Sequence, residues 1–317
     1  MFEGANGARQ LEVAAQSRIG AGPAQRVENQ DNFLTIDAAG RASYLAGGAM
    51  QAAQVDGWPP GHIRLAVMDG MGGHGHGREA AETVAAGLLA IPACLDLDTL
   101  TRYLEGLHFR LQKRFDDLHE AGPRPGTTLT MLEMPATGNP LLWHAGDSRL
   151  YEITPRAATP LTVDHVPATV LAMAGLLDEA AWWRHVHGSH APQIAQAFIL
   201  GNTLADPARL DDGLFGLDAA TLPPWLRALP DRRALHLRID ATYLLATDGF
   251  WSCSDPAEFV ARWPRLFAGG DARACLDALF DEMAQHPPVG VQPDNLTAIV
   301  LRVRGTGIDE TALPQSN

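Results

Sequence analysis

The sequence predicts a globular α+β protein, and three observations carry that prediction. Apolar runs of strand length are bounded by turn residues, as in residues 63–68. Two long segments, residues 78–91 and 98–120, have helix-forming composition, and the second repeats an apolar residue at every third or fourth position. Residues 127–154 then predict three successive strands without a helix between them. Strands and helices therefore come in separate runs.

The N-terminal part is expected to be built from strands. Residues 11–19 alternate loosely between apolar and polar side chains, which predicts a first strand. The polar segment 26–31 leads into a second strand, and the glycines and prolines of residues 37–62 indicate a hairpin with a long irregular excursion. The apolar run Ile63–Met68 predicts a buried strand that stops at Asp69, after which five glycines follow within eight residues.

Helices and further strands are expected after this glycine-rich loop. We expect Asp98 to be the N-cap of the second long helix. Residues 161–229 contain short helical pieces interrupted by glycine and proline, which predicts an inserted flap subdomain. One domain, residues 10–304, is expected, with flexible termini at residues 1–9 and 305–317. The remaining elements are strands at 127–133, 141–145, 149–154, 235–239, 242–247 and 293–303, a helix that begins at Asp255, and a helix at 271–286.

The composition limits the possible functions. The chain of 317 residues has 24 basic and 37 acidic side chains and a net charge of −13, which argues against nucleic-acid binding because a phosphate backbone needs a basic surface. No segment is long and apolar enough for a membrane helix, and the N-terminus lacks the features of a signal peptide. The cysteines Cys94, Cys253 and Cys275 form no CxxC pair. We therefore expect a reduced, cytoplasmic protein.

Five aspartates stand where a loop meets an apolar strand: Asp31, Asp69, Asp147, Asp248 and Asp294. Carboxylates at the strand ends of one sheet converge on one edge and repel one another strongly unless cations lie between them. Oxygen donors of this kind favour magnesium or manganese over zinc. A single Asp-Gly pair is more often only a turn, and the loop after Asp69, taken alone, could hold either a metal or a phosphate. Five such acids favour a metal site.

Seven short motifs occur in order along the chain. They are Arg26 with Asn29-Gln30-Asp31, Asp69-Gly70-Met71-Gly72-Gly73-His74, Gly126-Thr127-Thr128, Gly146-Asp147-Ser148-Arg149, Leu161-Thr162 with Asp164-His165, Asp248-Gly249, and Asp294-Asn295 with Thr297. Each motif alone is weak, but the ordered set resembles the metal-dependent protein phosphatases of the type 2C (PPM) family, in its bacterial serine/threonine phosphatase branch. The resemblance covers about residues 10–304, although residues 166–230 match only loosely.

The resemblance implies a four-layer α-β-β-α sandwich, in which helices flank two central antiparallel β-sheets and the flap is an insertion. It also implies hydrolysis of phosphoserine and phosphothreonine by in-line attack of a metal-bridging hydroxide, without a phosphoenzyme. Two Mn²⁺ or Mg²⁺ ions are expected, with a third, weaker site. The expected partners are phosphorylated protein substrates of a cognate serine/threonine kinase, and the chain is expected to be a monomer that binds neither nucleic acid nor a membrane.

Carried over position by position, the resemblance implies three catalytic residues. Arg26 would clamp the substrate phosphate with its planar guanidinium group. Asp31 would orient metal-bound water, and Asp69 would bridge the two metal ions. Asp147 and Asp248 would hold the third ion. The complete set of implied metal ligands is Asp69, the carbonyl of Gly70, Asp147, Asp248 and Asp294.

Two positions depart from the family pattern, because Gln30 and Met71 stand where some members have a glutamate and a histidine. Gln30 removes a charge near the metals and should weaken their binding slightly. Met71 cannot give a proton to the leaving alkoxide, so a metal-bound water or His74 would have to do so. Because every expected acidic ligand is present, we favour an active enzyme. The alternatives are a non-catalytic phosphoprotein-binding module on the same fold and an activity on small phosphomonoesters.

Several other polar residues are expected to have structural roles. His165 is expected to anchor the base of the flap, and Arg149 is expected to pair with a nearby carboxylate. Three flap histidines are expected to be exposed and without a role: His185, His187 and His190.

Overall fold

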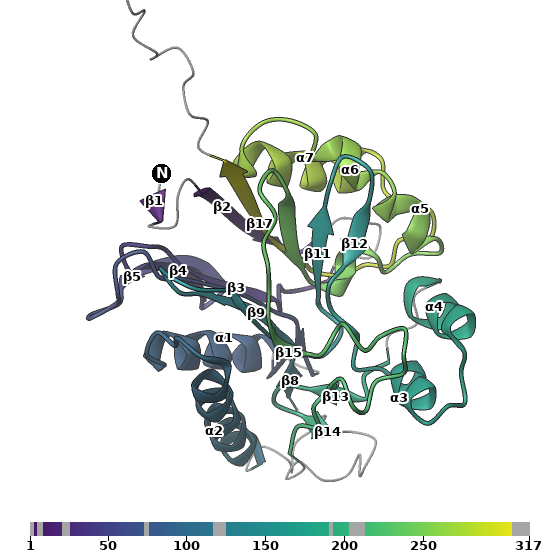
Figure 1. Ribbon diagram of the computed structural model, residues 1–317, viewed down its shortest axis with the longest axis horizontal. Helices are drawn as coiled ribbons and strands as arrows, with labels where there is room; N and C mark the ends of the chain where they lie inside the picture. The colour runs from purple at the N-terminus through teal and green to yellow at the C-terminus, as the bar shows by residue number, and fades with distance from the viewer. Residues whose placement is uncertain are drawn as a thin grey trace, which may run out of the picture.

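In the computed structural model of the chain, the described residues are 3–4, 9–20, 26–72, 76–116, 125–189, 193–202 and 213–305. They form two large antiparallel β-sheets that face each other between two layers of helices (Figure 1). A smaller unit with two short helices lies beside one end of the sheets. The predicted four-layer α-β-β-α sandwich is therefore confirmed.

The first sheet brings the two ends of the chain together. Strand β17 (Leu296–Gly305) pairs along its whole length with β2 (Arg9–Arg18). The strand order is β1 (Glu3–Gly4), β2, β17, β16 (Thr242–Ala246), β11 (Arg149–Ile153) and β12 (Ala158–Pro160). Its outer face is covered by α5 (Pro256–Val260), α6 (Trp263–Leu266) and α7 (Ala272–Gln285) (Figure 1).

The second sheet has the predicted buried strand at its centre. Strand β6 (Ile63–Met68) is buried at all six positions because one face meets the first sheet and the other meets helices. The strand order is β15 (Arg232–Ala234), β10 (Leu141–Ala145), β9 (Leu129–Met134), β6, β3 (Asn32–Ile36), β4 (Arg41–Ala46) and β5 (Ala49–Gln54). Its outer face is covered by α1 (His76–Ala90) and α2 (Leu97–Asp116) (Figure 1).

The alternation of side chains along β6 shows how the layers are held together. Leu65 and Val67 point into the core between the two sheets, where they share a cluster with Leu245 of the first sheet. Ala66 and Met68 point the other way and join the core under α1 and α2. A third apolar core packs α5, α6 and α7 on the first sheet.

Three predicted boundaries need correction. The N-cap of α2 is Asp96, whose Oδ1 accepts a hydrogen bond from the Thr99 amide at 2.8 Å, so Asp98 instead lies in the first turn. The predicted strand at 235–239 is wrong, because the strand that pairs there is β15 and ends at Ala234. The predicted strand at 127–133 is two strands, β8 (Gly126–Thr127) and β9, which belong to different sheets.

The hairpin in residues 37–62 is more regular than predicted. Strands β4 and β5 pair without interruption from Arg41 opposite Gln54 to Ala46 opposite Ala49. Gly47 and Gly48 join them with positive φ angles of 61° and 71°, which suit the tight turn of a two-residue hairpin. The irregular excursion is thus limited to the segment after β5.

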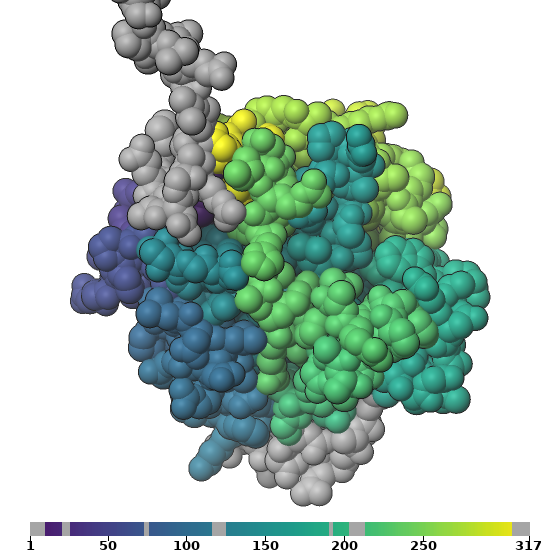
Figure 2. All heavy atoms as spheres, in the orientation of Figure 1, coloured from purple at the N-terminus to yellow at the C-terminus, as the bar shows by residue number. Residues whose placement is uncertain are grey.

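The flap subdomain has its own small core. It contains α3 (Pro167–Met173), α4 (Glu179–His187) and a short ladder of β13 (Gln196–Ala197) with β14 (Gly201–Asn202). The indole of Trp182 is buried among Val163, Leu217 and their apolar neighbours. Figure 2 shows residues 213–240, in green, filling the front of the molecule between the blue helical layer and the teal α4.

The described residues include part of each end of the chain. Strand β1 pairs with β2, so residues 3–4 of the predicted flexible N-terminus are part of the sheet edge. The predicted tail beyond Gly305, and the predicted helix end at residues 117–120, lie outside the described residues. No helix in the described part of the chain is both long enough and apolar enough to cross a membrane.

Candidate active site

Strand register brings two of the predicted aspartates together in the second sheet. Strands β3 and β6 are antiparallel, and Asn32 lies opposite Met68. Continuing this register by one residue places Asp31, which precedes β3, opposite Asp69, which follows β6. This pairing follows from the sequence, because Asp31 immediately precedes one apolar strand and Asp69 immediately follows the other.

The first sheet supplies the other three aspartates. Strands β11 and β16 are antiparallel with Arg149 opposite Ala246, so Asp147 and Asp248 lie opposite each other two residues beyond the ladder. Asp294 precedes β17, which pairs with β16 and therefore starts at the same end. The turn that contains Asp147 crosses from β10 in one sheet to β11 in the other. The acids thus lie where the ends of both sheets meet.

The five acids also interact electrostatically with one another. Desolvation raises the pKa of Asp69 well above its ordinary value, and repulsion from Asp31, Asp248, Asp294 and Asp147 raises it further. Burial raises the pKa of Asp31 to about 7, with contributions from Asp294 and Asp248. Burial and the charge of Asp248 also raise the pKa of Asp147. A group of mutually repelling carboxylates is costly to keep buried unless a cation compensates it.

This set of donors suits a hard divalent cation in its chemistry and placement. Carboxylate and carbonyl oxygens are the ligands that Mg²⁺ and Mn²⁺ prefer, and a bound cation would reverse the upward pKa shifts. Within the described residues, no three His, Cys, Asp or Glu side chains form a group that could hold a metal ion as they stand. Since the uncompensated carboxylates repel one another, we expect their side chains to rotate inward around a cation.

Gly70 occupies a position where no side chain fits. It lies in β7 (Gly70–Met71), which pairs with β8. A Cβ atom at Gly70 would lie 2.3 Å from the backbone oxygens of both Gln30 and Gly77. The loop before β3 and the start of α1 therefore pack directly against this backbone, and a side chain at position 70 would displace them.

Arg26 lies beside one of the five acids. Its Nη2 is 2.9 Å from Oδ1 of Asp294, and its Nε donates a hydrogen bond to the Pro293 carbonyl at 3.2 Å. The side chain is 50% exposed, whereas that of Asp294 is 22% exposed. The only guanidinium group that the sequence assigned to phosphate binding is thus accessible at the edge of the carboxylate group.

Hydroxyl groups that hold these acids in place were not predicted from the sequence. Thr247 Oγ1 donates a hydrogen bond to Asp31 Oδ2 at 2.7 Å. Thr128 Oγ1 accepts the backbone amide of Asp69 at 3.0 Å and lies 2.6 Å from Ser148 Oγ. The signal that could have identified them is their position, since Thr247 and Ser148 each directly adjoin a predicted aspartate in the sequence.

Asn295 connects three of the loops that form the site. Its Oδ1 accepts the Gln30 amide at 2.9 Å, and its Nδ2 donates to the carbonyls of Ile19 and Glu28 at 3.2 and 3.1 Å. The Gln30 side chain in turn donates to Glu28 at 2.9 Å, and Glu28 pairs with Arg78 at 3.2 Å. Gln30 is therefore part of a polar network around the site, and a negative charge remains close by at Glu28.

The proton donor for the leaving group is not identified by the structure. Met71 lies half-buried in β7. His74, one of the two predicted sources of the proton, lies outside the described residues, and His76 starts α1 with its Nδ1 3.8 Å from Glu79. That a metal-bound water gives the proton to the leaving group is the other possibility named from the sequence, and it stays a prediction.

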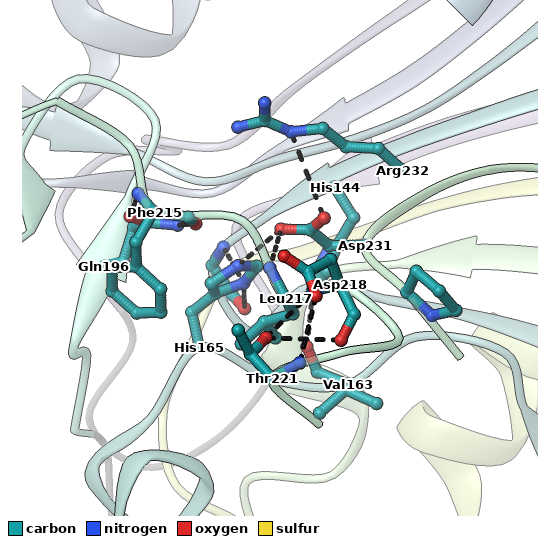
Figure 3. Close-up of polar contacts among 12 residues, drawn as sticks. His144, Val163, His165, Gln196, Phe215, Leu217, Asp218, Thr221, Asp231 and Arg232 are labelled. Atoms are coloured by element: carbon teal, nitrogen blue, oxygen red, sulfur yellow. Dashed lines mark hydrogen bonds and ion pairs between the residues drawn. The ribbon is translucent and has the colours of Figure 1, made fainter. Parts of the chain in front are cut away.

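His165 anchors the flap, as predicted (Figure 3). Its Nε2 lies 3.1 Å from Oδ2 of Asp231, and its Nδ1 lies 3.2 Å from the Gly146 amide. The same Asp231 oxygen accepts the Leu217 amide at 2.9 Å. The base of the flap is thereby fastened next to the turn that carries Asp147.

Arg149 forms the predicted ion pair, and its partner is Asp164. The two side chains are buried, with Nη2 and Oδ2 2.7 Å apart, and the same Nη2 donates to the Val186 carbonyl of α4 at 2.7 Å. One flap prediction is wrong, because His187 is buried and stacks on Trp183 at 4.1 Å. Its burial and the charge of Arg149 lower its pKa to about 2. His185 is exposed as predicted, and His190 lies outside the described residues.

Comparison with known proteins identifies the fold. No protein-family model and no curated protein sequence matches the chain. Solved structures do: a serine/threonine phosphatase of S. agalactiae (TM-score 0.63, 18% identity, 92% of this chain and 99% of that chain) and the phosphatase Stp1 of Staphylococcus aureus (0.60, 19%, 96% and 98%). The catalytic domain of the serine/threonine phosphatase PstP, solved with two manganese ions, is also similar (0.59, 21%, 93% and 99%).

These similarities support the resemblance to the type 2C phosphatases. At 18 to 21% identity they show that the chain shares the fold of bacterial serine/threonine phosphatases over almost its whole length. The chemistry of this chain has to be argued from its own residues.

Proposed function

We propose that this protein is a metal-dependent phosphatase that hydrolyses phosphoserine and phosphothreonine in proteins. The observation that carries the proposal is the group of five mutually repelling aspartates at the shared end of two sheets, with an accessible arginine beside it. Such a group is costly in a protein without a ligand. A hard cation would compensate the negative charge of the aspartates, and a phosphate ester would compensate the positive charge of the arginine. The fold shared with bacterial serine/threonine phosphatases supports the same reaction.

The residues that would hold two Mn²⁺ or Mg²⁺ ions are Asp69, Gly70, Asp248 and Asp294, with Asp147 and Asp248 at a third site. When bound, the ions lower the pKa of water and neutralise charge that develops on the phosphoryl group. Asp31 would orient the attacking water, and the hydrogen bond from Thr247 fixes the direction of its carboxylate.

Arg26 would hold the substrate through its charge and planar geometry. Its guanidinium group now pairs with Asp294. When Asp294 acts as a metal ligand, this carboxylate has a cation to compensate it, and the Arg26 donors can turn to the phosphate oxygens. The phosphate oxygens of a dianionic ester would therefore take the place of the Asp294 carboxylate as the acceptors for Arg26. Solvent already reaches Arg26 at this position.

Hydrolysis of p-nitrophenyl phosphate with and without Mn²⁺ tests the proposal. We expect turnover that needs Mn²⁺ and that falls by about 100-fold or more in Asp248→Asn, because loss of a ligand should cost at least as much as loss of an outer-shell partner. Asp240→Asn is the matched control, since Asp240 lies in an exposed turn with φ 62°, a conformation that asparagine tolerates. Turnover without metal, or equal rates in the two variants, would contradict the proposal.

A phosphopeptide assay separates the two alternatives. Tight binding without phosphate release at any Mn²⁺ concentration would instead identify a non-catalytic phosphoprotein-binding module. Faster release from small metabolites than from phosphopeptides would identify a phosphatase of small monoesters. The proposal expects release from phosphopeptides, with phosphoproteins made by a serine/threonine kinase as natural substrates.

The expected cellular setting belongs to the same proposal. Cys94, Cys253 and Cys275 are buried free thiols, which suits a protein that works in a reducing compartment such as the cytoplasm. We further propose that the chain acts as a monomer, and light scattering of the purified protein tests this.

A further inference from the structure

An apolar groove of about 330 Å³ begins at the candidate active site. One wall is the end of β2 with Arg18 and Gly20, and the other is the C-terminal part of α7 with the loop that follows it. The groove ends against Asp294 and Gly249, which directly follows Asp248. One of the five aspartates and the residue next to another therefore line the groove.

The lining of the groove suits an apolar side chain. Its floor is formed by the buried Phe280, Met283 and Leu296, and the apolar surface that a ligand can reach includes the exposed Ala284 and Pro287. Arg18 lies over the Phe280 ring at 5.0 Å and gives the rim a positive charge. Apolar surface of this kind gains free energy when a ligand covers it.

The groove and the proposed phosphate-binding arginine share one loop. Arg26 bonds to the carbonyl of Pro293 and to the carboxylate of Asp294, and the same loop lines the groove through Gln292 and Asp294. This loop is itself fixed, because the Gln292 amide donates to the Ser252 carbonyl at 2.8 Å. A ligand in the groove therefore lies against the loop that positions Arg26.

Exposed apolar residues extend this surface around the site. Val289 in the loop after α7 is 81% exposed, Ile19 at the end of β2 is 38% exposed, and Val27, which follows Arg26, is 101% exposed. Scattered exposed apolar side chains are common, but Ile19 and Val289 lie on the segments that line the groove, and Val27 adjoins the arginine that pairs with Asp294. The arrangement favours a ligand that continues past the phosphate in an extended form.

We propose that this groove is a specificity subsite that takes an apolar side chain next to the phosphorylated residue of a protein substrate. The inference rests on the proposed phosphatase function and deepens it. The continuity with Arg26 and Asp294 selects this occupant, because Arg26 pairs with Asp294 and Asp294 also lines the groove, so a residue next to a phosphate held by Arg26 lies close to it. Arg18 at the rim adds a preference for an acidic residue close to the apolar one.

The experiment uses phosphothreonine peptides in which one leucine is moved through the flanking positions of a glycine-serine sequence. At one position, we expect leucine to raise kcat/KM about tenfold over the all-polar peptide, as burial of one such side chain allows. Ala284→Trp, which fills the groove from its exposed wall, should abolish this preference while hydrolysis of p-nitrophenyl phosphate stays unchanged. Ala284→Glu, which puts a charge there, should do the same.

Gln285→Trp is the matched control, because Gln285 is the next residue of α7, is exposed, and does not line the groove. It should keep the leucine preference. Absence of a leucine preference at every position would overturn the inference, as would a preference that survives Ala284→Trp or is lost equally in Gln285→Trp.

Failure of the proposed function is recognised separately. If wild-type protein hydrolyses neither p-nitrophenyl phosphate nor peptide at any Mn²⁺ concentration, the phosphatase proposal fails. Fluorescence anisotropy with the same labelled peptides then still tests the groove. Leucine-dependent binding that Ala284→Trp removes would support the subsite, and leucine-independent binding or no binding would overturn it.

Discussion

Buried acids in this protein are of two kinds, and their surroundings decide which kind each is. Burial raises the pKa of a carboxyl group everywhere in the interior. At Asp69 the neighbouring acids raise it further. At Glu133 hydrogen bonds from His62 and Arg64, together with the charge of Arg64, outweigh burial and hold the pKa below its ordinary value. Glu133 thus stabilises the fold as an anion, whereas mutual repulsion and burial disfavour the charged form of Asp69.

Replacing Glu133 by glutamine should destabilise the protein strongly. Its carboxylate is fully buried and accepts bonds from Arg64 Nε at 2.7 Å, His62 at 2.8 Å and the Cys94 amide at 2.8 Å. Breaking such a buried pair leaves the Arg64 charge uncompensated, so we expect a loss of about 3 kcal/mol in the free energy of unfolding, measured by urea denaturation at pH 7. Glu105→Gln, which breaks a partly exposed pair with Arg232, should cost less, about 1 kcal/mol or below.

The same pair of measurements has a defined pH dependence. Because the folded-state pKa of Glu133 lies below its ordinary value of 4.5, its contribution is present above pH 4.5 and is lost as the pH falls through the folded-state pKa. The difference between wild type and Glu133→Gln should therefore shrink below pH 4.5. A difference that stays constant across this range would contradict the assignment.

The aspartates could be predicted because a single residue type recurs at one structural position, the end of an apolar strand. Their hydroxyl partners were missed, because the position of Thr247 and Ser148 beside an aspartate does not show which acid or backbone group each hydroxyl contacts until the sheets are assembled. The burial of His187 was also beyond prediction. The burial of His187 depends on stacking with Trp183 and on Arg149, which extends from β11 and donates a hydrogen bond to α4.

The flap shows how a segment of short helices and strands is held at its base by a few polar contacts. Local patterns predicted its existence from glycines and prolines, but not the pairing of His165 with Asp231, which lie 66 residues apart. For the same reason the strand after the flap was misplaced. Residues 235–239 have a strand-like composition, but the available edge of β10 is already paired by β15.

Asp231→Ala should loosen the flap with little effect on the sandwich. The substitution removes acceptors for His165 and for the Leu217 amide, which fix the segment 213–231 to the flap base (Figure 3). We expect at least tenfold faster hydrogen exchange in peptides from this segment, with unchanged exchange in β6 and β16, measured by mass spectrometry. Asp218→Ala removes only exposed turn bonds to Ala220 and Thr221, so its effect should stay local.

Two exchange patterns would contradict a local role of Asp231. If exchange rises in β6 and β16 together with the flap, Asp231 supports the whole fold and the flap has no separate stability. If Asp231→Ala and Asp218→Ala accelerate the same peptides by the same factor, the buried anchor has no special role.

The whole molecule gathers the five acids at one end of the sandwich, where strand ends of both sheets lie close together. Long apolar strands and two helical layers supply the stability, and antiparallel register then brings acids from distant parts of the chain together without any local signal beyond their own position. This is why the sandwich and the grouping of the five aspartates could be predicted from ordered motifs, whereas the groove beside Asp294 could not. The groove depends on how α7 packs across β2 and β17, and no motif in the sequence marks it.

The effect of a single substitution on the unfolding temperature should therefore change sign when metal is added. In the presence of a chelator, Asp69→Asn removes one charge from the repelling group and should raise the unfolding temperature by about 2 °C, corresponding to roughly 1 kcal/mol. With Mn²⁺ at about 100 times its dissociation constant, wild type should gain about 2.7 kcal/mol of stability by binding. Asp69→Asn should lose most of this gain, so the order of the two unfolding temperatures reverses.

Differential scanning fluorimetry of both proteins with chelator, Mn²⁺ and a matched concentration of NaCl measures this reversal. Asp240→Asn carries the same change of charge in an exposed turn and should show the wild-type response to Mn²⁺. NaCl should leave the order unchanged, because screening acts weakly on a buried group. If Asp69→Asn is less stable than wild type in the chelator as well, Asp69 stabilises the metal-free fold through its own contacts, and repulsion among the five aspartates is not what the cation relieves.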